Sequence, residues 1–150
     1  MKSKLDNFLG WMLAIILGAM VVDVTWGVFT RYAMGYQSSW TDELARFLMI
    51  WIGILGAAFA SGKDMHIAID LLPQYLNEKN NKRLNIFITT IIVLFVLVVF
   101  IIGGLRYVYI SFTLGQTSAA LKLPMGIVYS IFPISGIIII YYRIYNTFYN

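Results

Sequence analysis

The sequence predicts an all-α integral membrane protein with four transmembrane helices and an interfacial amphipathic helix between the second and the third. Apolar residues make up 60% of the 150 residues and charged residues only 12%, about half of the charged fraction of ordinary soluble domains. Four stretches approach or reach the roughly 20 apolar residues that a membrane-crossing helix needs. A soluble chain of this size would have to expose much of that apolar surface to water.

The predicted spans form a single membrane domain and cover residues 8–30, 40–62, 86–110 and 124–142. The first span carries one charge, Asp23. The second must include Arg46, because its uncharged part from residue 47 to residue 60 is too short to cross a bilayer. The third is uncharged as far as residue 105 and the fourth throughout, so both cross hydrocarbon without burying an ion there.

Local signals mark the ends of these helices. Ser39 followed by Asp42 can form a capping box at the start of the second span. Pro124 fits the first turn of the fourth span, where a missing N–H group costs nothing. Pro133 lies inside that span, so it frees a backbone carbonyl and predicts a kink.

The segment 66–80 is predicted to be more than a linker. Its apolar side chains fall on one face at helical spacing, namely Ile67, Leu71, Leu72, Tyr75 and Leu76. This pattern is typical of an amphipathic helix that lies in the membrane interface, and Pro73 marks a helix start or a break within it.

The basic residues predict the orientation. Four crossings place both termini on one side, and that side would carry Lys2, Lys4, Lys63, Lys79, Lys82, Arg83 and Arg143. The two connections on the other side carry only Arg31 and Lys122. Because cytoplasmic segments are enriched in lysine and arginine, we expect both termini in the cytoplasm.

Several function classes are excluded or disfavoured. The chain has no cysteine, which excludes disulfides, thiol catalysis and cysteine-ligated zinc. The net charge is +4, and the basic residues cluster in the loops and near the termini. This distribution indicates the orientation of the chain in the membrane rather than nucleic-acid binding. Since there is no catalytic motif and no metal-ligand cluster, we expect neither an enzyme nor a cofactor in this chain.

Three charged positions carry alternative interpretations. A charge inside a membrane costs roughly 2.5–3.5 kcal/mol on insertion scales, so Asp23 needs a reason. It is either a proton or cation site, or a buried partner of Arg46, Arg106 or another subunit. Asp42 and Glu43 share a helix face with Arg46, which favours an ion-paired helix start that docks on a partner over acid–base chemistry.

The remaining candidates are a lone histidine and a set of small residues. His66 has Asp70 four residues on, which favours a role in the turn after the second span over a pH switch or a metal site. Gly53 with Ala57, and Gly56 with Ala60, have the spacing that allows close helix packing, within the chain or with a partner.

The ordered motifs resemble one family along nearly the whole chain. They are Arg31-Tyr32, the run from Trp40 to Arg46, Trp51, Gly56-Ala57-Ala58, His66-Ile67-Ala68-Ile69-Asp70, and Leu123-Pro124 followed by Tyr129 and Pro133. Together they resemble the small membrane subunit, of the DctQ or SiaQ type, of tripartite ATP-independent periplasmic (TRAP) transporters.

The resemblance implies a location and a set of partners. The chain would lie in the bacterial inner membrane beside a large elevator-type membrane subunit that binds substrate and sodium ions, among membrane lipids. A periplasmic binding protein would deliver an organic acid of the C4-dicarboxylate or sialic acid class. This chain would brace the large subunit, with no catalytic, substrate-binding or metal site of its own.

Under that interpretation the motif residues are contacts and anchors. Residues at the subunit interface or acting as structural anchors would be Arg31, Trp40, Asp42, Glu43, Arg46, His66, Asp70 and Pro124. Arg31 and Lys122 would face the periplasm, where the binding protein docks.

Two alternatives compete with this interpretation. A stand-alone, proton-coupled multidrug exporter would act as a dimer and use Asp23. A membrane enzyme or respiratory-complex anchor would need histidines for haem or quinone, and the chain has only His66.

Overall fold

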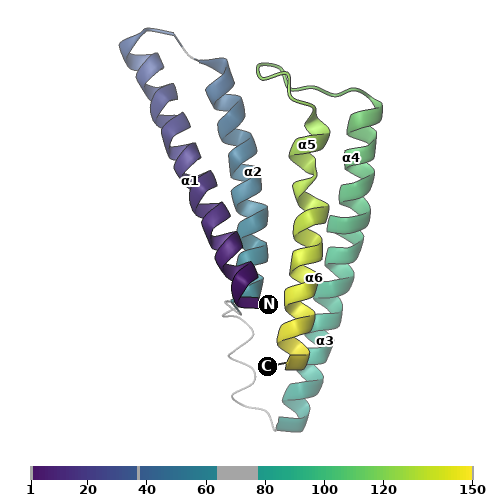
Figure 1. The fold of residues 1–150 in the computed structure, drawn as a ribbon. Helices are drawn as coiled ribbons and strands as arrows, with labels where there is room; N and C mark the ends of the chain where they lie inside the picture. The colour runs from purple at the N-terminus through teal and green to yellow at the C-terminus, as the bar shows by residue number, and fades with distance from the viewer. Residues whose placement is uncertain (1, 37, 64–77, 150) are drawn as a thin grey trace.

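A computed structural model describes residues 2–36, 38–63 and 78–149, and the regular structure in these ranges is helical. The chain forms two helical hairpins, one built from the first two helices and one from the rest (Figure 1). The segments are α1 (Lys2–Ala33), α2 (Ser39–Gly62), α3 (Glu78–Val96), the π-helical η2 (Leu97–Gly103), α4 (Gly104–Thr113), α5 (Met125–Tyr129) and α6 (Ile131–Tyr149).

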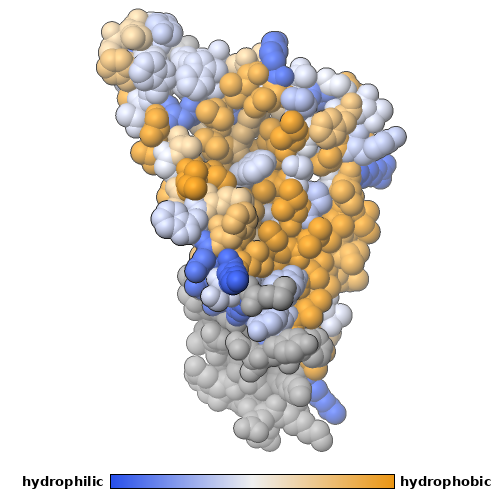
Figure 2. All heavy atoms as spheres, viewed as in Figure 1, coloured by the Kyte–Doolittle hydropathy of each residue, from blue (hydrophilic) through white to orange (hydrophobic). Residues whose placement is uncertain are grey.

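Four helices in the described ranges are long and apolar enough to cross a membrane, namely Lys2–Ala33, Ser39–Gly62, Arg83–Thr113 and Met125–Thr147. This confirms the predicted all-α class with four spans. Apolar residues cover the middle of the visible face, and hydrophilic residues gather toward its ends (Figure 2). The predicted interfacial helix at 66–80 lies outside the described residues, apart from its last three residues, which belong to the start of α3.

The spans are arranged in a row rather than around a common centre. Helix α1 packs against α2, α2 packs against α6, and α6 packs against α3, η2 and α4 (Figure 1). The fourth span is therefore the most buried, and α1, at the edge of the row, is the least. A row of this kind leaves wide apolar flanks for lipid or for a partner subunit.

Two small apolar clusters hold the row together. The first joins α1, α2 and α6 through the buried side chains Leu9, Leu55, Ile131 and Tyr142. The second joins α2, the third span and α6 through Ala58, Val96 and Ile139. Both clusters include α2 and α6, so the contact between these two helices couples the two hairpins.

The fourth span is interrupted near its proline, as expected. The break falls at Ser130, between α5 and α6, three residues before Pro133. The proline ring has no N–H group to donate to the carbonyl four residues back, and it also crowds that carbonyl, so the distortion appears upstream of the ring. At this break the Val128 carbonyl accepts a hydrogen bond from Trp51 Nε1 of α2, at 3.1 Å.

The third span passes close to this break. It becomes π-helical over Leu97–Gly103 and returns to α-helix at Gly104, which is buried. A Cβ atom on Gly104 would lie 2.9 Å from Pro133 Cδ and 3.1 Å from Phe132 Cβ. The absence of a side chain at this position is what lets α4 and α6 approach so closely.

The start of α2 differs from the predicted capping box. Ser38 precedes the helix and makes no side-chain capping hydrogen bond, whereas Ser39 is already helical. Instead, the buried Thr41 hydroxyl donates to the Ser38 carbonyl at 2.7 Å. The prediction was wrong because helix α2 begins at Ser39, so this serine cannot supply the flanking cap.

Both chain ends lie at the same end of the row (Figure 1), which we name the terminal end. There Lys2 Nζ donates to Asn146 Oδ1 at 2.7 Å, and the Tyr142 hydroxyl donates to Asp6. The opposite end carries the α1–α2 connection and the 114–124 loop, and we name it the loop end. These polar contacts connect the first and last helices across the whole sequence.

Candidate functional site

The most elaborate polar structure among the described residues is at the loop end, around Glu43. Helix α2 places this carboxylate beneath the 114–124 loop, 76 to 78 residues further along the chain. Its oxygens accept hydrogen bonds from the backbone N–H groups of Ala119, Ala120 and Leu121, at 2.9, 2.8 and 2.8 Å. Bonds from N–H groups to an ionised carboxylate are stronger than bonds between neutral groups, so Glu43 fixes this loop to α2.

The loop is also ordered by its own bonds. Thr117 pairs with Pro124, and the Ser118 N–H donates to the Leu123 carbonyl at 2.9 Å. Lys122 adopts a positive φ of 56°, which is uncommon for a residue with a side chain, and its side chain is exposed. Glu43, Lys122 and Pro124, which were predicted separately, therefore belong to one structure.

The structure pairs Glu43 with the 114–124 loop rather than with Arg46. Glu43 uses its oxygens on the loop, and within the described ranges Arg46 makes no ion pair and is exposed. The spacing permitted a contact, but the loop offers three donors to the same carboxylate. Arg31 is also exposed, and it lines a small cleft between α1 and α2 together with Asp42.

One face of α2 is not covered by the rest of the chain. Its exposed residues recur at steps of three or four and run from the loop end downward as Asp42, Arg46, Met49, Gly53 and Ala57. No side chain or other helix comes within 4 Å of a Cβ atom built on Gly53. The Gly53–Ala57 pair therefore does not pack within the described chain, and we name these five residues the α2 stripe.

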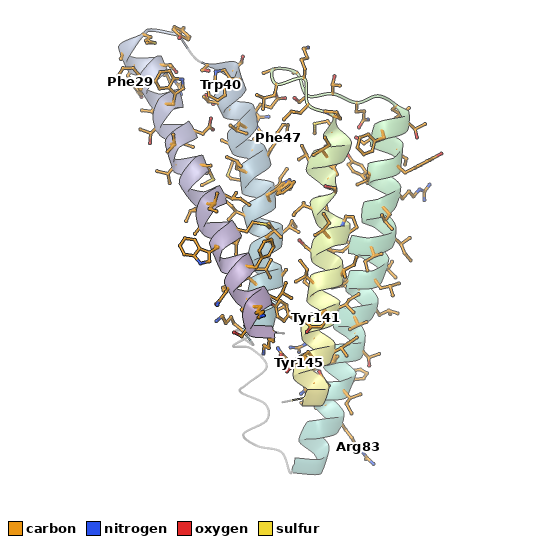
Figure 3. The ribbon with its side chains drawn as sticks, viewed as in Figure 1. Phe29, Trp40, Phe47, Arg83, Tyr141 and Tyr145 are labelled. Carbon is orange, nitrogen blue, oxygen red and sulfur yellow. The ribbon has the colours of Figure 1, made fainter. Side chains whose placement is uncertain are left out.

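The tryptophans of the motif have different environments. Trp51 is half-buried and bonds to the α5–α6 break, whereas Trp40 is 42% exposed. In Figure 3, Phe29 and Trp40 lie at the loop end, and Tyr141, Tyr145 and Arg83 lie toward the terminal end. Aromatic side chains at both ends of a helical row are typical of the two membrane interfaces.

Several polar contacts were not anticipated from the sequence. They are the bonds of Lys2 and Asp6 to α6, the Asn146 amide bond to the Ser61 carbonyl, and the hydroxyl pair of Thr89 and Thr147. No sequence signal connects residues so far apart. His66 and Asp70 lie outside the described residues, and within the described ranges no group of three acidic, histidine or cysteine side chains is placed to hold a metal ion.

The geometry defines a multi-pass membrane protein whose polar groups hold helices and a loop in place. A family model described as "Tripartite ATP-independent periplasmic transporters, DctQ component" matches residues 8–150. The chain therefore belongs to this family, the small permease subunits of TRAP transporters. Its relatives are transporter subunits and not enzymes.

Individual relatives agree with the family match. The chain is 29% identical over 143 residues to a Haemophilus influenzae protein named as a TRAP transporter small permease, covering 93% of this chain and 87% of that protein. It is 26% identical over 139 residues to the sialic acid TRAP transporter small permease protein SiaQ of Vibrio cholerae, covering 88% and 80%.

A third relative is much longer. The sialic acid TRAP transporter permease protein SiaT of Haemophilus influenzae is 31% identical over 105 residues, which are 69% of this chain and only 16% of that protein. In SiaT the matching segment is thus one part of a large permease chain. A large permease component accompanies the small one in this family.

Proposed function

We propose that this chain braces the static part of a large elevator-type permease subunit during sodium-coupled uptake of an organic acid. The observation that carries the proposal is the open row α1–α2–α6–α3/α4, which has wide apolar flanks. An elevator needs one part that stays fixed in the membrane while another part slides. A broad row of helices supplies such a fixed footprint.

The α2 stripe is the surface that best fits the large subunit. It lies on a central helix and combines the charged residues Asp42 and Arg46 near the loop end with small residues further along. Small residues allow close approach of a partner helix in lipid, and polar groups near the interface define its position. Sodium ions and the substrate would bind in the large subunit.

The loop end is proposed to face the periplasm, with both termini in the cytoplasm of a bacterium and the row in its inner membrane. The distribution of lysine and arginine supports this orientation. The loop fixed by Glu43 presents the exposed Lys122, and Arg31 is exposed at the end of α1. These cations are proposed contacts for the periplasmic binding protein.

The substrate is proposed to be a sialic acid or a C4-dicarboxylate. Two of the relatives described above are named for sialic acid transport, which supports the first class. The family membership gives no support to a stand-alone exporter that uses Asp23, and resistance to toxic compounds on expression of this chain alone would be needed to revive it.

The test is an uptake assay in bacterial cells that lack their own carriers for these acids. We expect labelled sialic acid or C4-dicarboxylate to accumulate only when the large subunit, the binding protein and this chain are all expressed with a sodium gradient. Uptake by liposomes that contain this chain alone would contradict the proposal.

A matched pair of variants tests the α2 stripe. Arg46→Gln should lower recovery of the large subunit with the tagged chain, because Arg46 lies on the stripe. Arg106→Gln removes another exposed arginine, from α4, and should leave recovery unchanged. Equal recovery with both variants would remove the α2 stripe from the interface.

A further inference from the structure

Asp23 is a buried carboxylate that the fold of this chain does not satisfy. It is 5% exposed, and neither carboxylate oxygen has a hydrogen-bond partner among the described residues. Almost every other side chain in this half of α1 is exposed, including Val22 and Val24. Leaving a buried carboxylate without a partner is costly, so its retention in a membrane helix indicates a function.

Asp23 lines a groove between α1 and α2 near the loop end, and its two carboxylate oxygens are buried beneath the wall of that groove. The groove has a volume of about 570 Å³, and its walls include Trp26, Trp40 and Leu44. The two indoles are 45% and 42% exposed. A carboxylate combined with indole faces attracts a cationic side chain through an ion pair and through cation–π contacts.

Other occupants fit less well. A hard metal ion needs several oxygen ligands, and Asp23 is the single acidic side chain on this groove in the described chain. The phosphate of a lipid headgroup is an anion, so the carboxylate on this groove would repel it. A two-fold pairing of two copies through this groove would bring acidic groups face to face.

We propose that this groove receives a lysine or arginine side chain from a transmembrane helix of the large permease subunit. This rests on the proposed function and places one specific contact within it. In SiaT the matching segment is 16% of a much longer permease chain, so in that protein the segment and the rest of the permease belong to one polypeptide. Asp23 then gains its missing partner only on assembly.

If the large subunit supplies the cation, removing the charge of Asp23 should stabilise the isolated chain and weaken its complex with the large subunit. Asp23→Asn should raise the melting temperature of the isolated chain in detergent, because an uncompensated buried charge is removed. The same variant should reduce recovery of the large subunit with the tagged chain by roughly tenfold or more. Val21→Ala, at an exposed position outside the groove, should change neither measurement.

A lower melting temperature of Asp23→Asn would assign Asp23 an ordinary structural role and overturn the proposal. Unchanged recovery of the large subunit would overturn it as well. If the wild-type chain recovers no large permease at all, the proposed function itself fails. If the wild type and Asp23→Asn recover it equally, only the groove assignment fails.

Photo-crosslinking identifies the occupant directly and does not depend on Asp23. A benzophenone amino acid replaces Val22, which lines the groove and is 70% exposed. We expect an adduct with the combined mass of this chain and the large subunit. An adduct at twice the mass of this chain, an adduct to phospholipid, or no adduct to the large subunit would overturn the proposal.

Discussion

At the scale of one residue, Glu43 shows how the structure determines which partner a motif residue binds. Its place in the motif predicted an anchor, and helical spacing predicted Arg46 as its partner. The structure gives it three backbone N–H groups of the 114–124 loop instead. Short-range spacing shows which residues are able to meet, whereas the choice of partner depends on what the fold brings alongside.

Glu43→Gln should loosen the loop, because the amide keeps the size of the side chain but loses its charge. We expect faster hydrogen exchange at Ala119, Ala120 and Leu121, and a larger effect for Glu43→Ala. Lys122→Gln also changes the charge by one unit but breaks none of the three bonds, so exchange there should be unchanged. Equal exchange in wild type and Glu43→Ala would refute the anchoring role.

Tyr142 plays a comparable part at the terminal end. Its side chain is fully buried, and its hydroxyl bonds to Asp6 of α1. Tyr142→Phe should lower the free energy of unfolding in detergent by about 1 kcal/mol, because one hydrogen bond is lost. Tyr109→Phe changes a hydroxyl on a side chain that is 71% exposed and should be neutral. Equal stabilities of the two variants would show that the Asp6 bond contributes nothing.

At the scale of elements, the third and fourth spans show which helix irregularities can be predicted from the sequence. Pro133 in the sequence predicted an interruption, and the structure has one at Ser130. The π-helical segment was not predicted. The close approach at Gly104 was not predicted either, because it is a contact between two helices that neither helix shows alone.

Neighbouring glycines test this packing. Gly104→Ala should destabilise the fold by about 1–3 kcal/mol, because the new methyl group would overlap the Pro133 ring and the Phe132 Cβ atom. Gly103→Ala should be neutral or slightly stabilising, since its nearest neighbour would be at an ordinary 3.5 Å. Thermal unfolding in detergent, followed by tryptophan fluorescence, compares the two. Equal destabilisation would contradict the close packing.

At the scale of the whole molecule, the position of both termini at one end agrees with four crossings. The side of the membrane on which they lie is an electrostatic prediction. Because the chain has no cysteine, the labelling of a single introduced cysteine reports the side of the membrane on which that residue lies. In intact cells with a permeable outer membrane, Lys122→Cys should react with a membrane-impermeant maleimide and Lys4→Cys should not. The reverse pattern would invert the proposed topology.

The sequence by itself determined the medium of this protein, its four spans and its family, because apolar runs, loop charges and ordered motifs are local features. Only the tertiary structure decided the order of helices in the row, the loop partner of Glu43 and the unsatisfied state of Asp23. The physical reason is that lipid solvates every apolar helix face almost equally well. Helix pairing therefore depends on shape and on a few polar contacts between residues far apart in the chain.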